Sequence, residues 1–162
     1  MRVEIIRSPR RRSTAQARIV DGVLQVRVPV GLPRKEEDRL VAGFVTRFSR
    51  NQAAGTIDVA ERARHLSTKF DLPQARSVRW VGNMSSRWGS CTINTGDIRV
   101  SDRLAAYPDW VLDYVIVHEL CHLVVTDHSP AFWKLVNRYP LAERARGYLL
   151  AKGTETDDDV SG

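Results

Sequence analysis

The sequence predicts an α+β fold in which a small, mostly antiparallel β-sheet packs against a helix bearing the pattern HELCH and against further helices. Three observations predict it. Short alternating runs of β-forming residues flank a turn signal in the amino-terminal part. Longer segments with apolar residues at helical spacing follow Pro33 and Pro108. With 162 residues, of which 43% are apolar, the chain can also close one ordinary hydrophobic core.

The first strands are predicted on both sides of Asp21-Gly22, a dipeptide that favours a tight hairpin because both residues tolerate positive φ. They cover about residues 15–20 and 23–29, and VEIIR at residues 3–7 is a third. Further along, SVRWVGN and GDIRVS alternate like strands around the Ser- and Gly-rich segment MSSRWGSCTINTG. We therefore expect two strand regions, the second with a conspicuous connection.

Helices are predicted between and after the strands. RKEEDRLVAGFVTRF has acidic residues in its first turn and apolar residues at helical spacing, and IDVAERARHLSTKF repeats this pattern before Pro73 ends it. Pro108 and Asp109 suit the first turn of a helix that should continue through about Val125. SPAFWKLVNRY and LAERARGYLLAK then read as two helices separated at Pro140.

We expect one domain over residues 1–152 and an acidic, disordered tail over residues 153–162, because GTETDDDVSG has a single apolar residue. The first ten residues lack the apolar run of a signal peptide, and no stretch approaches the length of a membrane span. Two cysteines are too few for a secreted disulfide framework. The sequence therefore predicts a cytoplasmic protein with free thiols.

The HELCH pattern predicts a metal site. His118 and His122 lie four residues apart, about 40° around a helix axis, so both can bind one ion. Glu119 adjoins the first histidine and is placed to take a proton from an activated water as general base. The alternative is a buried helix that merely carries these residues, but each buried polar group would then need its own partner. A divalent cation satisfies all three.

A catalytic zinc usually takes three protein ligands, so one more is needed. His128 follows His122 by six residues, which is the spacing of the metzincin pattern. Val125 stands where that pattern has a Gly, but TDHSP is suited to turn the chain a little later. Glu143 on the last helix is the rival third ligand, and we favour His128.

Two remaining candidates have plainer interpretations. Cys121 points away from the ligand face of its helix and should pack as a small apolar side chain. His65 lies in an ordinary amphipathic helix, where a surface position or a satisfied polar contact is expected.

The charge of the chain is uneven. Residues 1–100 hold 19 Lys and Arg against 9 Asp and Glu, whereas residues 101–162 hold 6 against 10. An arginine-rich part that includes RSPRRR could attract an anionic partner such as a nucleotide or a nucleic acid. A solvated surface is the alternative, and it is favoured.

Three blocks in order, SRWGSC, DYVIVHELCHL and HSPAFW, resemble the YgjP-like metallopeptidase domain, a relative of the SprT-like zinc proteases. The resemblance runs from the first hairpin to about residue 140. It implies a minimal zincin fold, zinc bound by His118, His122 and His128, and Glu119 as the catalytic base. The segment SRWGSC could bind extended substrate by strand addition, and its Arg87 could bind substrate or stabilise an oxyanion. The alternative is that Trp88 packs on the helix while Gly89 permits a tight turn.

The leading functional hypothesis is a zinc-dependent metallopeptidase that cleaves peptide bonds with a zinc-activated water and a glutamate base. Two alternatives remain open. One is a metal-dependent hydrolase of a phosphorylated substrate such as a nucleotide, which the arginine-rich part would suit. The other is a nucleic-acid-associated protein of the SprT-like kind, although no zinc finger or recognition helix is visible in the sequence.

Overall fold

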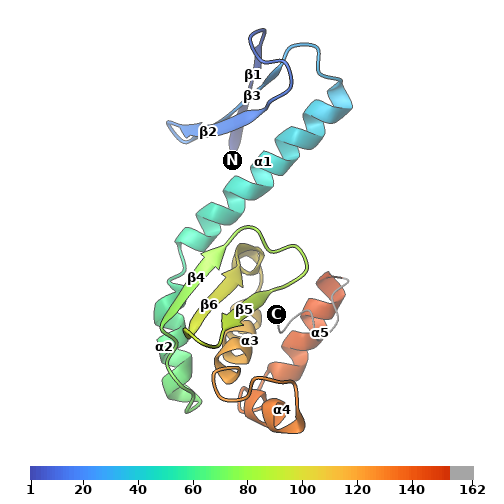
Figure 1. The fold of residues 1–162 in the computed structure, drawn as a ribbon. Helices are drawn as coiled ribbons and strands as arrows, with labels where there is room; N and C mark the ends of the chain where they lie inside the picture. Colours follow the sequence, from blue (N-terminus) through green and yellow to red (C-terminus); the bar gives the residue numbers. More distant parts are fainter. Residues whose placement is uncertain (154–162) are drawn as a thin grey trace. The chain divides into compact units, whose positions relative to one another are not determined.

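The structure, a computed structural model, describes residues 1–153 (Figure 1). The acidic tail predicted from residue 153 onward lies outside the described residues, Gly153 excepted. Two compact units make up the chain, Met1–Gln52 and a second from Ala53 onward, where the sequence analysis expects one domain over residues 1–152. Each unit has its own cluster of buried apolar side chains.

The first unit is a three-stranded sheet with a long helix. Its elements are β1 (Arg2–Ser8), β2 (Gln16–Val20), β3 (Val23–Pro29) and α1 (Arg34–Gly55), whose last residues belong to the second unit. Asp21 and Gly22 have positive φ angles of 49° and 76°, as the hairpin prediction requires. Alternate residues of the central strand β3 are fully buried against apolar residues of α1. An ion pair of 2.7 Å between Arg7 and the buried Glu37 joins β1 to α1.

The second unit is built around one helix. Its elements are α2 (Val59–Lys69), β4 (Ser77–Val81), β5 (Gly89–Thr92), β6 (Asp97–Ser101), the 3₁₀ helix η1 (Asp102–Ala106), α3 (Asp109–Cys121), α4 (Pro130–Val136) and α5 (Ala142–Lys152). Figure 1 shows α3 beside the sheet, with α2 and α5 on its two sides. From Val111 onward every residue of α3 except Asp113 is buried. A helix buried on all sides is rigid and can hold reactive side chains in fixed positions.

The α+β class is confirmed, but the strands pair differently from the expectation. The strand orders are β1-β3-β2 and β4-β6-β5, and in each sheet the first pairing is parallel and the second antiparallel. The sheets are therefore mixed rather than mostly antiparallel. Hairpin signals identify strands joined by a short turn, whereas nothing local specifies which edge the first strand of each sheet joins.

Three elements differ in extent from the predictions. The strand β5 lies in the segment that was expected to be a connection. It could not be predicted from composition because Gly and Ser have little preference for strands, so packing decides its conformation. Helix α3 ends at Cys121 rather than near Val125. Helix α1 continues to Gly55, well beyond Phe48, where the predicted helix ends.

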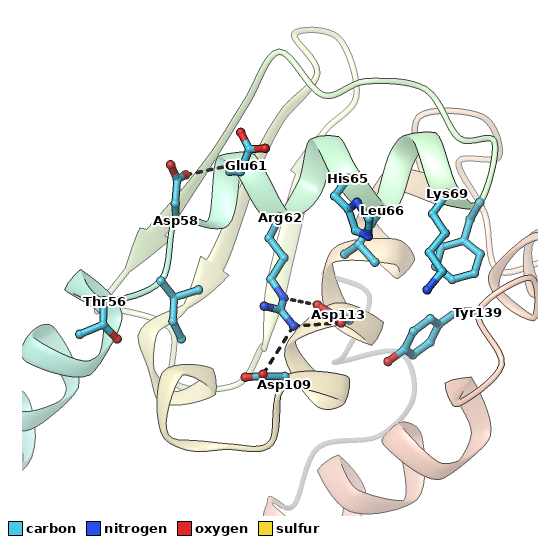
Figure 2. A pocket seen from close by; sticks show the side chains of 12 residues that line it. Thr56, Asp58, Glu61, Arg62, His65, Leu66, Lys69, Asp109, Asp113 and Tyr139 are labelled. Atoms are coloured by element: carbon cyan, nitrogen blue, oxygen red, sulfur yellow. Dashed lines mark hydrogen bonds and ion pairs between the residues drawn. The ribbon is translucent and has the colours of Figure 1, made fainter.

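An arginine fixes α3 against α2 (Figure 2). The guanidinium of Arg62 on α2 forms two hydrogen bonds with the carboxylate of Asp113, and one nitrogen lies 3.8 Å from Asp109. These groups line a cavity of about 650 Å³. His65 lines the same cavity from α2 and is exposed, as expected. The contacts of Arg62 with Asp113 and Asp109 therefore position α3 against α2.

Candidate metal centre

The first two histidines of the site come from the carboxyl-terminal half of α3. His118 is fully buried, and His122 caps the helix with helical angles, φ −65° and ψ −17°, which preserves the spacing of one turn. Nδ1 of His122 lies 3.1 Å from the carbonyl oxygen of Val125. Because a carbonyl can only accept, this nitrogen carries the proton and leaves Nε2 with its lone pair. Nδ1 of His118 lies 3.4 Å from the hydroxyl of Tyr114.

The chain turns back after α3 without a glycine. The amide of Val124 bonds the carbonyl of Cys121 at 3.0 Å in a tightened last turn, and Val125 does not have positive φ. Asp127 then accepts a hydrogen bond of 3.2 Å from the amide of Ser129. Ser129 is the N-cap of α4, and Pro130 occupies its first turn. This turn places His128 opposite the two helical histidines.

The three histidines lie together. One ring nitrogen from each of His118, His122 and His128 lies within 4.8 Å of the other two. The Nε2 atoms of all three are buried and have no hydrogen-bond partner among residues 1–153. Buried ring nitrogens without a hydrogen-bond partner are costly unless another group or an ion satisfies them. The donor set of three converging imidazole nitrogens fits a zinc ion with one open position.

Aromatic side chains of α4 hold the imidazole rings in place. The ring of Phe132 lies 4.4 to 5.0 Å from each of the three histidine rings, measured between centroids. Trp133 lies 5.7 Å from His118 and 5.9 Å from His128. The sequence analysis did not identify these two residues as part of the site. The signal was their position four and five residues after His128, at the start of a helix.

Burial favours the neutral form of His118 and His122. It lowers the pKa of His118 well below its ordinary value, and the charges of the other two histidines and of Arg146 lower it further. The pKa of His122 is also lowered, chiefly by burial. Neutral imidazole is the form that binds a metal, because the ligand nitrogen must be unprotonated.

Glu119 is buried without a partner. Its side chain is 0% exposed, and neither carboxylate oxygen has a hydrogen-bond partner among the described residues. Burial raises its pKa well above the ordinary range, and the charge of Arg87 opposes this effect. A carboxyl group with a raised pKa exchanges protons more readily near neutral pH, which suits a general base that later acts as an acid.

The segment SRWGSC approaches this glutamate closely. Gly89 lies in β5, so it does not form the tight turn that was one interpretation of it. A Cβ atom at Gly89 would lie 2.9 Å from Cγ1 of Val115 and 3.1 Å from Cγ and Oε1 of Glu119. Trp88 is buried, and the guanidinium of Arg103 lies 4.0 Å from its ring. The packing interpretation of Trp88 is therefore confirmed, and Gly89 permits close contact between β5 and α3.

Gly89→Ala is expected to destabilise the second unit by about 1–3 kcal/mol and to lower activity. The new methyl group would overlap Val115, a β-branched residue with little freedom to rotate, and would displace the carboxylate of Glu119. Thermal unfolding and the turnover rate measure the two effects.

Gly147→Ala is the matched control for this substitution. Gly147 lies on the exposed side of α5, and a Cβ there would meet nothing within 4 Å. Alanine should be neutral or stabilise the helix by up to about 1 kcal/mol. Equal unfolding temperatures for the two variants would contradict the close contact at Gly89.

The other sequence candidates lie outside the histidine cluster. Glu143 is exposed on α5 and does not join the three histidines. Cys121 is a free, fully buried thiol within the core, as expected, and burial raises its pKa to about 12. Cys91 is also free and partly buried. Arg87 is exposed, at the end of the loop that precedes β5.

No helix among the described residues has both the length and the apolar character to cross a membrane.

Comparisons with known proteins agree with the fold. The metallopeptidase zymogen abylysin from Pyrococcus abyssi matches with a TM-score of 0.53 and 19% identity, covering 61% of this chain and 98% of that one. The metallopeptidase zymogen jannalysin from Methanocaldococcus jannaschii matches with a TM-score of 0.51 and 16% identity, covering 59% and 97%. At such low identity these likenesses bear on the fold. A search of curated protein sequences found no match.

A family model carries the assignment further. The model of the YgjP-like metallopeptidase domain matches residues 25–150, which include β5, all three histidines and Glu119. The chain belongs to the YgjP-like metallopeptidase domain family.

Proposed function

We propose that this protein is a zinc-dependent peptidase whose metal is held by His118, His122 and His128 and whose general base is Glu119. The observation that carries the proposal is a set of buried atoms without partners among the described residues: the Nε2 atoms of three histidines whose rings converge, and both oxygens of Glu119, the residue next to His118 in the chain. Five such atoms together would be a large cost for a purely structural core. Zinc supplies a lowered pKa for water and a polarised substrate carbonyl when it is bound at such a site.

Other steps of the proposed reaction depend on residues of the chain itself. The carboxylate of Glu119 takes a proton from the attacking water and returns it to the leaving amine, for which its raised pKa is suited. Val125 accepts from Nδ1 of His122 and fixes that ring. Phe132 restricts the rotation of all three imidazoles through its ring contacts.

The strand β5 offers a place for the peptide. It is an edge strand of its sheet, and Gly89 brings it against Glu119. An extended peptide can pair with such an edge by main-chain hydrogen bonds. This arrangement would deliver a backbone carbonyl to the region between β5 and α3.

The alternatives in the sequence analysis receive less support. Both the family and the fold matches are to metallopeptidases, which favours a peptide or protein substrate. None of these comparisons supports a nucleotide or nucleic-acid partner for the arginine-rich part. A cytoplasmic location remains a prediction.

The test is hydrolysis of a mixed peptide library by the purified protein. We expect cleavage that stops when a chelator removes zinc and returns when zinc is restored, because the Nε2 atoms of the three histidines have no hydrogen-bond partner among the described residues and are available to hold the metal. Mass spectrometry of the products measures it. Cleavage that persists at full rate in the metal-free protein would reject the proposal.

A further inference from the structure

A second cavity lies next to the segment that leads into β5. Its volume is about 250 Å³, and its lining comprises residues 83–87, Ser90 and Arg99. Two of these residues are arginines, four are Ser or Asn, and none is acidic. Pockets for drug-sized ligands are about 300–1,000 Å³, so this one suits a single side chain or a chain end. Its lining calls for a negatively charged group.

Arg99 is held in position for such a group. It lies on β6 directly opposite Ser90 of β5, and its Nε donates to the Ser90 hydroxyl at 3.1 Å. Ser90 is only 4% exposed, so this contact is fixed by the core. Within residues 1–153, Arg99 forms no ion pair and this is its one side-chain hydrogen bond. Both terminal nitrogens of its guanidinium remain available, and a carboxylate accepts two parallel hydrogen bonds from that geometry.

Arg87 connects this cavity with the catalytic glutamate. It lines the cavity, and its charge also lies near enough to Glu119 to act on that carboxyl group. Within the described part of the chain it forms no ion pair. The cavity is therefore close to the place where we propose that a peptide bond is cleaved.

The geometry of β5 explains how one peptide could lie beside Glu119 and also reach the cavity at Ser90 and Arg99. Gly89 faces α3, so Ser90 faces the opposite side of the sheet, because successive residues of a strand alternate. Side chains of an extended peptide alternate in the same way. A residue next to the cleaved bond would thus point to the side of β5 on which Ser90 and Arg99 lie.

The larger cavity, shown in Figure 2, does not have a comparable arginine that lacks an ion pair. Its central guanidinium, that of Arg62, is already paired with Asp113 and Asp109, and its lining carries charges of both signs.

We infer that the cavity lined by Arg87, Ser90 and Arg99 binds a carboxylate of the peptide substrate, and that the protein therefore prefers peptides that carry a carboxylate near the cleaved bond. The carboxylate comes from an Asp or Glu side chain beside the cleaved bond or from the carboxyl terminus of the peptide. This inference rests on the proposed function, which supplies the peptide, and it adds the chemical class that is preferred.

Peptide binding tests the inference apart from catalysis. In a Glu119→Gln background, acetylated and amidated hexapeptides with one Glu at each position in turn are compared by calorimetry with their Gln counterparts. We expect the Glu peptide to bind about tenfold more tightly at one position, and less so at high salt. Adding Arg99→Gln should remove the preference, and Arg99→Glu should reverse it toward Lys peptides. Equal affinities for Glu and Gln at every position would overturn the inference for side chains.

Controls separate the sources of the carboxylate and guard against misfolding. Peptides with a free carboxyl terminus, compared with amidated ones, test the terminal group, and a preference there assigns the cavity to chain ends. Arg79→Gln removes an exposed charge from β4 beside Arg99 but outside the cavity, and it should leave the preference intact. Arg87→Gln, at an exposed position, repeats the test if Arg99 variants unfold. A preference that survives both Arg87→Gln and Arg99→Gln would overturn the inference.

Hydrolysis by the zinc-loaded protein then distinguishes the two proposals. Equal kcat/KM for Glu and Gln peptides, together with equal kcat/KM for peptides with free and amidated carboxyl termini, would overturn the inference and leave the peptidase function intact. Selective binding of acidic peptides without cleavage of any would leave the inference standing and reject the peptidase function.

Discussion

Glu119→Gln is expected to lower kcat for peptide hydrolysis by about 10²–10⁴-fold while the protein keeps its zinc. Glutamine has nearly the same shape as glutamate and fits the same buried position between β5 and α3, but it cannot accept the proton of the attacking water. Steady-state kinetics and zinc analysis of the same preparation measure the two quantities.

The stability of this variant provides the control. A buried carboxyl group with a raised pKa is costly to ionise, so the neutral amide should not lower the unfolding temperature. A variant with wild-type kcat would show that Glu119 is not the base. A variant that loses zinc together with activity would show that Glu119 acts on the metal site instead.

Zinc is expected to stabilise the second unit against heat, and His128→Ala should remove most of that effect. A ligand at 100 times its Kd stabilises by about 2.7 kcal/mol, which corresponds to a rise on the order of 5–10 °C in Tm. The structural reason is that zinc satisfies three buried Nε2 atoms at once, and the loop after α3 supplies the third. Differential scanning calorimetry with and without zinc measures the shift.

Glu143→Ala is the matched variant, because Glu143 is the rival third ligand but is exposed on α5, outside the histidine cluster. It should keep the full shift in Tm. Loss of the shift in Glu143→Ala but not in His128→Ala would reverse the assignment of the third ligand.

Local sequence pattern sufficed to predict the parts of this site that one helix fixes. His118 and Glu119 lie in the last turn of α3 and His122 is its C-cap with helical angles, so helix geometry alone determines which of them share a face. His128 could be predicted from its spacing and the family resemblance. The way the chain reaches it could not, because the expected glycine is replaced by Val125 and the helix ends early through tightened hydrogen bonds.

Contacts between segments that are distant in the chain could not be predicted from local sequence pattern. The stacking of Phe132 on His122 requires α4 to pack against α3, and the close approach of Gly89 to Glu119 requires β5 to lie along the same helix. Strand β5 itself has a composition typical of a loop. The parallel pairings of β1 and β4 are likewise set by tertiary packing, which the alternation of apolar residues does not encode.

We propose that three histidines hold one zinc ion with a position left open for chemistry. X-ray absorption spectroscopy of the zinc-loaded protein tests it most directly, because the outer scattering of imidazole rings identifies and counts them. The predicted spectrum shows three imidazole nitrogens at about 2.0–2.1 Å and one further light atom. A sulfur ligand at about 2.3 Å, or a site with fewer than three imidazoles, would contradict the account.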